Sequence, residues 1–146
     1  VIAGTATAGI PQAALLAERL DLPMAYVRGQ AKGHGKESRI EGRLEPGQRV
    51  IVIEDLLSTG GSSLSAAEAV RGAGAEPVAV FSIFTYGFEV AQRAFDAAGI
   101  RLVTLTDFDT LIGVAVETGS LTDEEVLILL NWRADAAAWS RVHGGA

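Results

Sequence analysis

The chain has 146 residues, the length of one ordinary domain, so we expect a single domain spanning residues 1–146. Hydrophobic residues make up 49% and charged residues 21%, which excludes a disordered or fibrous chain, and the net charge of −6 disfavours general binding to nucleic acid or anionic lipid. With no Cys and no apolar run near the ~20 residues of a membrane-spanning helix, we expect no disulfide, no thiolate metal site, no membrane partner and a cytoplasmic protein.

The first elements alternate between strand and helix. An apolar strand at 1–3 leads through a loop of small residues to a helix at 10–20 and then to a strand at 24–27. Residues 28–47 are polar and glycine-rich, which predicts a long mobile loop with room for a short hairpin. Loops of this length inside a compact domain are usually functional or disordered.

The alternation continues to the end of the chain. Further strands are predicted at 49–53, 78–84 and 101–105, and helices from after the small-residue segment 58–63 to about Gly72 and at 88–98. Alternating strands and helices predict an α/β fold with a mainly parallel central sheet flanked by helices.

The C-terminal part of the sequence predicts helices only. Helical spacing returns at 111–115, and Thr122 with Glu125 fits a capping box that begins the last helix. The apolar residues expected on the buried side of this last helix are Val126, Leu127, Leu129, Leu130, Trp132 and Trp139.

The strongest candidate site begins where the strand at 49–53 ends, with Glu54 and Asp55. Ligands of open parallel sheets bind beyond the carboxyl ends of the strands. Backbone N–H groups of the small-residue turn, the dipole of the next helix and the hydroxyls of Ser58, Thr59 and Ser62 predict a cradle for a phosphate. Two carboxylates beside it suit sugar hydroxyls or a Mg²⁺ ion. The alternative is an acidic strand end followed by an N-capped helix.

A second loop of small residues, Gly4–Gly9, allows backbone amides to approach an anion closely, although a plain tight turn explains the same residues. Two other phosphate motifs are disfavoured. A Walker loop needs a Lys after its glycines, and none lies between Arg49 and Arg71. No strand-to-helix turn carries the dinucleotide pattern G-x-G-x-x-G.

Four segments together resemble a known family. Residues 50–62 fit the phosphoribosyl-pyrophosphate signature of the type I phosphoribosyltransferases, with four apolar residues, an acidic pair, two apolar residues and then small residues with Gly. Residues 28–35, Arg-Gly-Gln-Ala-Lys-Gly-His-Gly, resemble the catalytic loop of the orotate phosphoribosyltransferases. Residues 4–11 are similar to the family's pyrophosphate loop, and 84–86 and 107–111 also resemble this group. The resemblance covers essentially the whole chain.

The resemblance implies transfer of the 5-phosphoribosyl group from phosphoribosyl pyrophosphate to orotate, giving orotidine 5′-phosphate and pyrophosphate in pyrimidine biosynthesis. It implies Mg²⁺, bound through pyrophosphate and water and through Glu54 or Asp55, and a homodimer in which the catalytic loop of one subunit reaches the neighbour's site. Catalytic roles are implied for Arg28, Lys32, His34 and Asp55. The donor-binding residues implied are Arg28, Lys32, His34, Glu54, Asp55, Leu56, Leu57, Ser58, Thr59, Gly60, Gly61 and Ser62, with Ser58 also beside orotate. The pyrophosphate loop implied is Thr5, Ala6, Thr7, Ala8 and Gly9.

The chain departs from the family pattern at two places. Gly29 stands where many members carry a second loop Lys, with Lys36 nearby. The family also has an N-terminal segment that covers the base, which we expect to precede Val1.

Two alternatives share the signature at 50–62. One is a phosphoribosyltransferase for a purine base, which only the loop at 28–35 separates from the orotate enzyme. The other is a regulator of the same fold that senses phosphoribosyl pyrophosphate and binds nucleic acid. Such a regulator needs a basic face, which the net charge of −6 disfavours.

Overall fold

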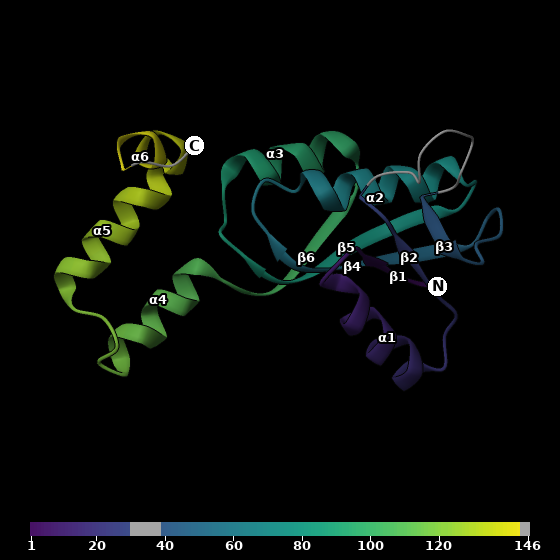
Figure 1. Ribbon diagram of the computed structural model, residues 1–146, viewed down its shortest axis with the longest axis horizontal. Coiled ribbons are helices and arrows are strands. Elements are labelled where there is room, and N and C mark those ends of the chain that lie inside the picture. The colour runs from purple at the N-terminus through teal and green to yellow at the C-terminus, as the bar shows by residue number, and fades with distance from the viewer. Residues whose placement is uncertain (30–38, 144–146) are drawn as a thin grey trace. The chain divides into compact units, whose positions relative to one another are not determined.

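The structure is a computed structural model that describes residues 1–29 and 39–143. The chain forms two compact units, Val1–Leu105 and Thr106–Ala146. The first unit is built on a six-stranded sheet with the order β3-β2-β1-β4-β5-β6 (Figure 1). The strands are β1 (Ile2–Thr5), β2 (Met24–Val27), β3 (Ile40–Gly42), β4 (Arg49–Leu57), β5 (Glu76–Thr85) and β6 (Arg101–Asp107). The prediction that residues 1–146 form a single domain stays a prediction.

The sheet is mainly parallel and has helices on both faces, as the sequence predicted. β1 pairs in parallel with β2 and with β4, and β4 pairs in parallel with β5. Helix α1 (Gly9–Leu20) covers one face, and α2 (Gly61–Gly72) and α3 (Glu89–Ala98) cover the other (Figure 1). Alternate residues of β4 therefore enter two cores, since successive strand side chains point to opposite faces. Val50 and Val52 pack with residues of α2 and α3, whereas Ile53 packs with Ala13 and Ala17 of α1.

The order of the strands reverses between β1 and β4. From β1 the chain runs through α1 to β2 on one side, and from β4 it runs through α2 to β5 on the other side. The loops that leave the carboxyl ends of β1 and β4 therefore diverge to opposite faces of the sheet. Such a reversal of strand order is where open α/β sheets bind ligands.

Strand β4 is longer than the sequence predicted. The prediction that it stops before Glu54 is wrong, because β4 continues to Leu57 and stays paired with β5. Glu54 lies opposite Ser82, and Leu57 lies opposite Thr85. The apolar pattern of the sequence stops at Glu54, because acidic residues have a low preference for strands. The backbone pairing of β4 with β5 continues past this point, and the sequence pattern does not reveal it.

Among its described residues, the segment 28–47 contributes one strand, β3, whose partner β2 precedes the segment, so they show no hairpin within it. β3 pairs antiparallel with β2, with Ile40 opposite Val27 and Gly42 opposite Ala25. Residues 30–38, which include Lys32, His34 and Lys36, lie outside the described residues.

The second unit consists of α4 (Phe108–Glu117), α5 (Asp123–Ala134) and α6 (Ala136–Val142). The capping box is confirmed, since the Thr122 hydroxyl accepts from the Glu125 amide and the Glu125 carboxylate accepts from the Thr122 amide. The prediction of one last helix with a buried side is wrong. Asp135 ends α5 and caps α6 by accepting from the Ala138 amide at 2.8 Å. All six residues expected on that side are half-buried or exposed: Val126, Leu127, Leu129, Leu130, Trp132 and Trp139.

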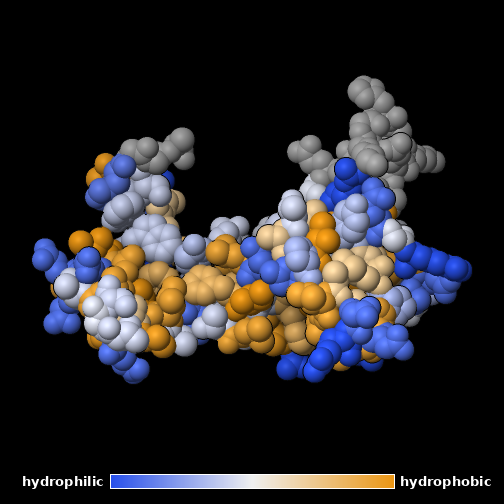
Figure 2. All heavy atoms as spheres, turned by 60° about the horizontal axis from the view of Figure 1, so that its bottom comes forward, coloured by the Kyte–Doolittle hydropathy of each residue, from blue (hydrophilic) through white to orange (hydrophobic). Residues whose placement is uncertain are grey.

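Apolar side chains are exposed on the face of the first unit that carries α1 (Figure 2). A groove of about 590 Å³ opens there, and its lining includes Leu15 and Leu20 of α1 and Phe81 and Ile83 of β5. Within the described ranges, no helix has the length and apolar character that a membrane crossing requires.

A substitution of Phe95 in α3 tests how α3 packs against the turn that precedes α2. It is fully buried, and its ring lies so close to Gly60 that a β-carbon on Gly60 would come within 2.7 Å of it. We expect Phe95→Ala to lower the free energy of unfolding in urea by about 3–5 kcal/mol, because it leaves a cavity. Val90→Ala is the control, since Val90 lies on the same helix and is 50% exposed. Its effect should stay near 0.5 kcal/mol or below, roughly the size for a surface substitution. Equal losses in the two variants would contradict this packing.

Candidate functional site

The two carboxylates of β4 stand in different environments. Glu54 is 5% exposed, whereas Asp55 is half-buried. The difference follows from strand geometry, because adjacent residues point to opposite faces. The prediction placed both residues together beyond the strand end. The structure places them within β4, so only one of them faces α2.

Glu54 is bound to the first turn of α2. Its Oε2 accepts hydrogen bonds from the hydroxyls of Ser62 at 3.0 Å and Ser63 at 2.8 Å, and its Oε1 accepts from the amide of Asp55 at 3.3 Å. Burial raises the pKa of the Glu54 carboxyl, and the hydrogen bonds from the two serines oppose that shift. Glu54 thus joins the end of β4 to the start of α2. Ser63 was missed by the sequence reasoning, since nothing local distinguishes it from the other small residues of this segment.

The helices α1, α2 and α3 of the first unit begin without a side-chain cap, and α1 and α2 follow the adjoining strands β1 and β4. The N-cap residue of α1 is Ala8 and that of α2 is Gly60, and neither has a side chain that accepts a hydrogen bond. The first amides of a helix have no partner within it, and the helix dipole is positive at that end. By contrast, side chains cap all three helices of the second unit. The starts of α1 and α2 are therefore suited to anions.

Close packing holds the loop between β1 and α1 against β4. A β-carbon on Gly9, the first residue of α1, would overlap the carbonyl oxygen of Ile53 in β4. The amide of Ala6 donates to the carbonyl of Val27 at 2.9 Å, and the Ala6–Thr7 peptide bond is cis. The loop at Thr5–Gly9 is thus held between the ends of β2 and β4.

The end of β5 supports the turn that follows β4. The Thr85 hydroxyl donates to the carbonyl of Leu57 at 3.2 Å and accepts from the amide of Gly87 at 3.1 Å. The amide of Tyr86 also donates to the Leu57 carbonyl, at 3.2 Å. Three aromatic rings at the end of β5 contact one another. Their centroids are 5.2 Å apart for Phe84 and Tyr86 and 5.6 Å apart for Tyr86 and Phe88.

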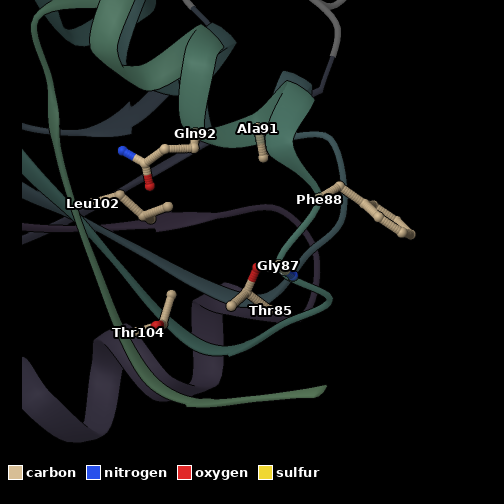
Figure 3. Close-up of a pocket in the computed structure, with 7 residues that line it drawn as sticks. All are labelled: Thr85, Gly87, Phe88, Ala91, Gln92, Leu102 and Thr104. Carbon is tan, nitrogen blue, oxygen red and sulfur yellow. Dashed lines mark hydrogen bonds between the residues drawn. The ribbon is translucent and has the colours of Figure 1, made fainter. Parts of the chain in front are cut away.

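A cavity of about 160 Å³, which Thr85 also lines, lies between α3, β5 and β6. Figure 3 shows Thr85, Gln92, Leu102 and Thr104 around it, while the ring of Phe88 points away. None of its described lining residues carries a charge. This cavity is therefore unsuited to a phosphate.

Arg28 follows β2 at the same carboxyl edge of the sheet. Its guanidinium lies 3.1 Å from the Glu41 carboxylate on β3 and is 32% exposed. The predicted cations Lys32 and His34 lie outside the described residues.

The other predicted residues gather at the ends of three neighbouring parallel strands, β2, β1 and β4. Leu56, Ser58, Thr59, Gly61 and Ser62 are exposed there, and Leu57 and Gly60 are buried. These residues lie far apart in the sequence but at the same edge of the sheet.

Comparison with known proteins identifies the family of the chain. A family model described as the phosphoribosyl transferase domain matches residues 1–110. The chain therefore belongs to the phosphoribosyl transferase domain family.

One similar protein has a more specific description than the family model. Over 138 residues, 94% of this chain, it is 54% identical to the orotate phosphoribosyltransferase of Phocaeicola vulgatus. The chain spans 65% of that relative's length.

Two solved structures share the fold. The orotate phosphoribosyltransferase of Aeropyrum pernix matches with a TM-score of 0.71 and 35% identity, over 83% of this chain and 66% of that one. The orotate phosphoribosyltransferase of Mycobacterium tuberculosis, in complex with 5-phospho-α-D-ribosyl 1-diphosphate, matches with a TM-score of 0.59 and 28% identity. That match covers 73% of this chain and 61% of the other.

The raised pKa of Glu54 predicts how stability changes with pH. The folded chain holds this proton more tightly than the unfolded chain, so the contribution is fully present below the ordinary value of 4.5 and is lost as the pH rises through the folded pKa. Glu54→Gln has no proton to lose. We expect it to make the free energy of unfolding fall less steeply above pH 4.5 than in the wild type, as urea titrations at a series of pH values would show.

Glu68→Gln, an exposed change on α2, is the matched control and should keep the wild-type slope. If both variants follow the wild-type curve, burial does not shift the Glu54 pKa as described.

Proposed function

We propose that this chain transfers the 5-phosphoribosyl group of phosphoribosyl pyrophosphate to orotate, which yields orotidine 5′-phosphate and pyrophosphate in pyrimidine biosynthesis. The observation that supports the donor is the meeting of two helix starts without side-chain caps beside the half-buried Asp55. The donor has two separated anionic groups and ribose hydroxyls between them, which this arrangement matches. The choice of orotate is supported by the relative at 54% identity.

The start of α2 is proposed to hold the 5′-phosphate. The turn from Leu57 to Ser62 would supply backbone amides, and the hydroxyls of Ser58 and Thr59 are exposed beside them. Ser58 is also the residue we place beside orotate. The loop at Thr5–Gly9 would bind the pyrophosphate in the same way, at the start of α1.

Asp55 is proposed as the main carboxylate for the ribose hydroxyls. The sequence reasoning gave this role to Glu54 as well, but both Glu54 oxygens already accept hydrogen bonds within the protein. Glu54 would act chiefly by holding the start of α2, which carries the phosphate cradle.

The departing pyrophosphate gains negative charge as the bond to C1 of the ribose breaks. Cations fixed at the leaving group lower the barrier, because they stabilise charge that develops in the transition state. Arg28 would act from the end of β2, and Lys32 and His34 from residues outside the described ranges. His34 would also donate a proton to the pyrophosphate, since an unperturbed imidazole titrates near pH ~6.5.

Mg²⁺ is proposed to bind with the donor. The described residues contain no group of three His, Asp or Glu side chains placed to hold a metal ion. Mg²⁺ ordinarily keeps several waters and binds through one or two carboxylates and substrate phosphates, so Asp55 and the pyrophosphate oxygens fit its needs. When bound, it would supply further positive charge at the leaving group.

The resemblance also supports a homodimer in which residues 28–35 of one subunit reach the neighbour's site. We further propose a cytoplasmic enzyme without nucleic-acid or membrane partners, which the net charge of −6 supports.

The direct test is the change in absorbance as orotate is consumed in the presence of phosphoribosyl pyrophosphate and Mg²⁺. We expect turnover with orotate and none with adenine, guanine or hypoxanthine. Turnover of a purine without turnover of orotate would replace the proposed acceptor and keep the donor. If titration calorimetry shows no binding of the donor, the proposal fails as a whole.

Asp55→Asn tests the ribose contact. It should weaken binding of phosphoribosyl pyrophosphate about tenfold or more, the equivalent of ~1.4 kcal/mol, while leaving the free energy of unfolding unchanged. Titration calorimetry and urea unfolding measure the two effects. Asp96→Asn, an exposed change on α3, should alter neither. Wild-type donor affinity in Asp55→Asn would remove this residue from the site.

A further inference from the structure

Arg39 joins three separate parts of the first unit. Its backbone carbonyl accepts from the amide of Arg28 at 2.8 Å, and its Nε donates to the carbonyl of Arg28 at 3.0 Å. Its Nη1 donates to the hydroxyl of Ser65 on α2 at 2.9 Å. One side chain thus links the end of β2, the segment that leads into β3, and the helix proposed to hold the phosphate.

This link joins two parts of the unit that the sheet connects only through β1. β2 and β3 lie on one side of β1, whereas β4 and the helix that follows it lie on the other. The pairing of strands fixes Arg28 relative to β1 but not relative to α2. The hydrogen bond from Arg39 to Ser65 connects the two directly, between residues 26 positions apart.

We propose that Arg39 is a positioning residue that holds Arg28 in place relative to the start of α2. The inference rests on the proposed function, in which Arg28 acts at the pyrophosphate. Glu41 holds the guanidinium of Arg28 at 3.1 Å, and Arg39 holds its main chain from both sides. Charge stabilisation depends on placement, and an error of about 1 Å costs roughly a hundredfold in rate.

The chemistry of the side chain explains why an arginine is needed. A guanidinium presents donors in a rigid planar fork, so Nε and Nη1 reach acceptors in two directions at once. A lysine in the same position keeps the positive charge but has a single ammonium on a flexible stem. Arg39→Lys therefore separates positioning from charge.

The test compares Arg39→Lys with Arg43→Lys. Arg43 is 87% exposed and pairs with Glu45, so its replacement should leave activity unchanged. We expect Arg39→Lys to lower kcat/KM for phosphoribosyl pyrophosphate roughly tenfold to a hundredfold. Calorimetric affinity for ribose 5-phosphate should stay at the wild-type level, because that ligand engages α2 and lacks the pyrophosphate. Ser65→Ala should show a smaller loss of the same kind.

Three outcomes would overturn the proposal. Full activity in Arg39→Lys would show that charge alone suffices. Equal loss of ribose 5-phosphate affinity would show a general structural role. Unchanged hydrogen exchange at the Arg28 amide in Arg39→Lys would show that Arg39 does not hold this segment. The exchange measurement needs no activity, so it decides the link even if the wild-type chain fails to use orotate and the proposed function falls.

Discussion

The site depends on a buried carboxylate that binds the first turn of a helix. Glu54 accepts hydrogen bonds from Ser62 and Ser63 in a place where an unpaired charge would be strongly unfavourable. That requirement holds the start of α2 against β4 and thereby sets the shape of the turn between them. The first amides of α2 have no side-chain cap because Gly60, in the left-handed region at a φ of 82°, precedes the helix without a side chain of its own.

The adjacent acidic residues Glu54 and Asp55 have different roles because of their places in β4. Strand geometry buries Glu54, which bonds within the protein, and leaves Asp55 half-exposed and available to a ligand. The same alternation gives β4 two cores, one with α1 and one with α2 and α3. Helices α1 and α2 therefore follow adjoining strands, and Gly9 at the start of α1 packs closely on Ile53 of β4.

Arg28 and the start of α2 lie on opposite sides of β1, so their relative placement is a separate structural problem. The sheet connects them only through β1, since β2 and β4 are not neighbours. Arg39 connects them directly, with one hydrogen bond from its guanidinium to the Arg28 carbonyl and another to the Ser65 hydroxyl. The arrangement leaves the exposed turn at Ser58 and Thr59 open to a ligand while the groups behind it are fixed.

Local patterns in the sequence determined the alternation of strands and helices, the Thr122–Glu125 capping box and the acidic pair before a small-residue turn, because each depends on residues close together in the chain. Only the tertiary structure decided that β4 continues through Glu54, that Asp135 divides the last helical segment, that Ser63 binds Glu54 and that Arg39 binds Ser65. Each of these rests on a partner brought close by folding or on the cost of burying a polar group. No local pattern records such a partner.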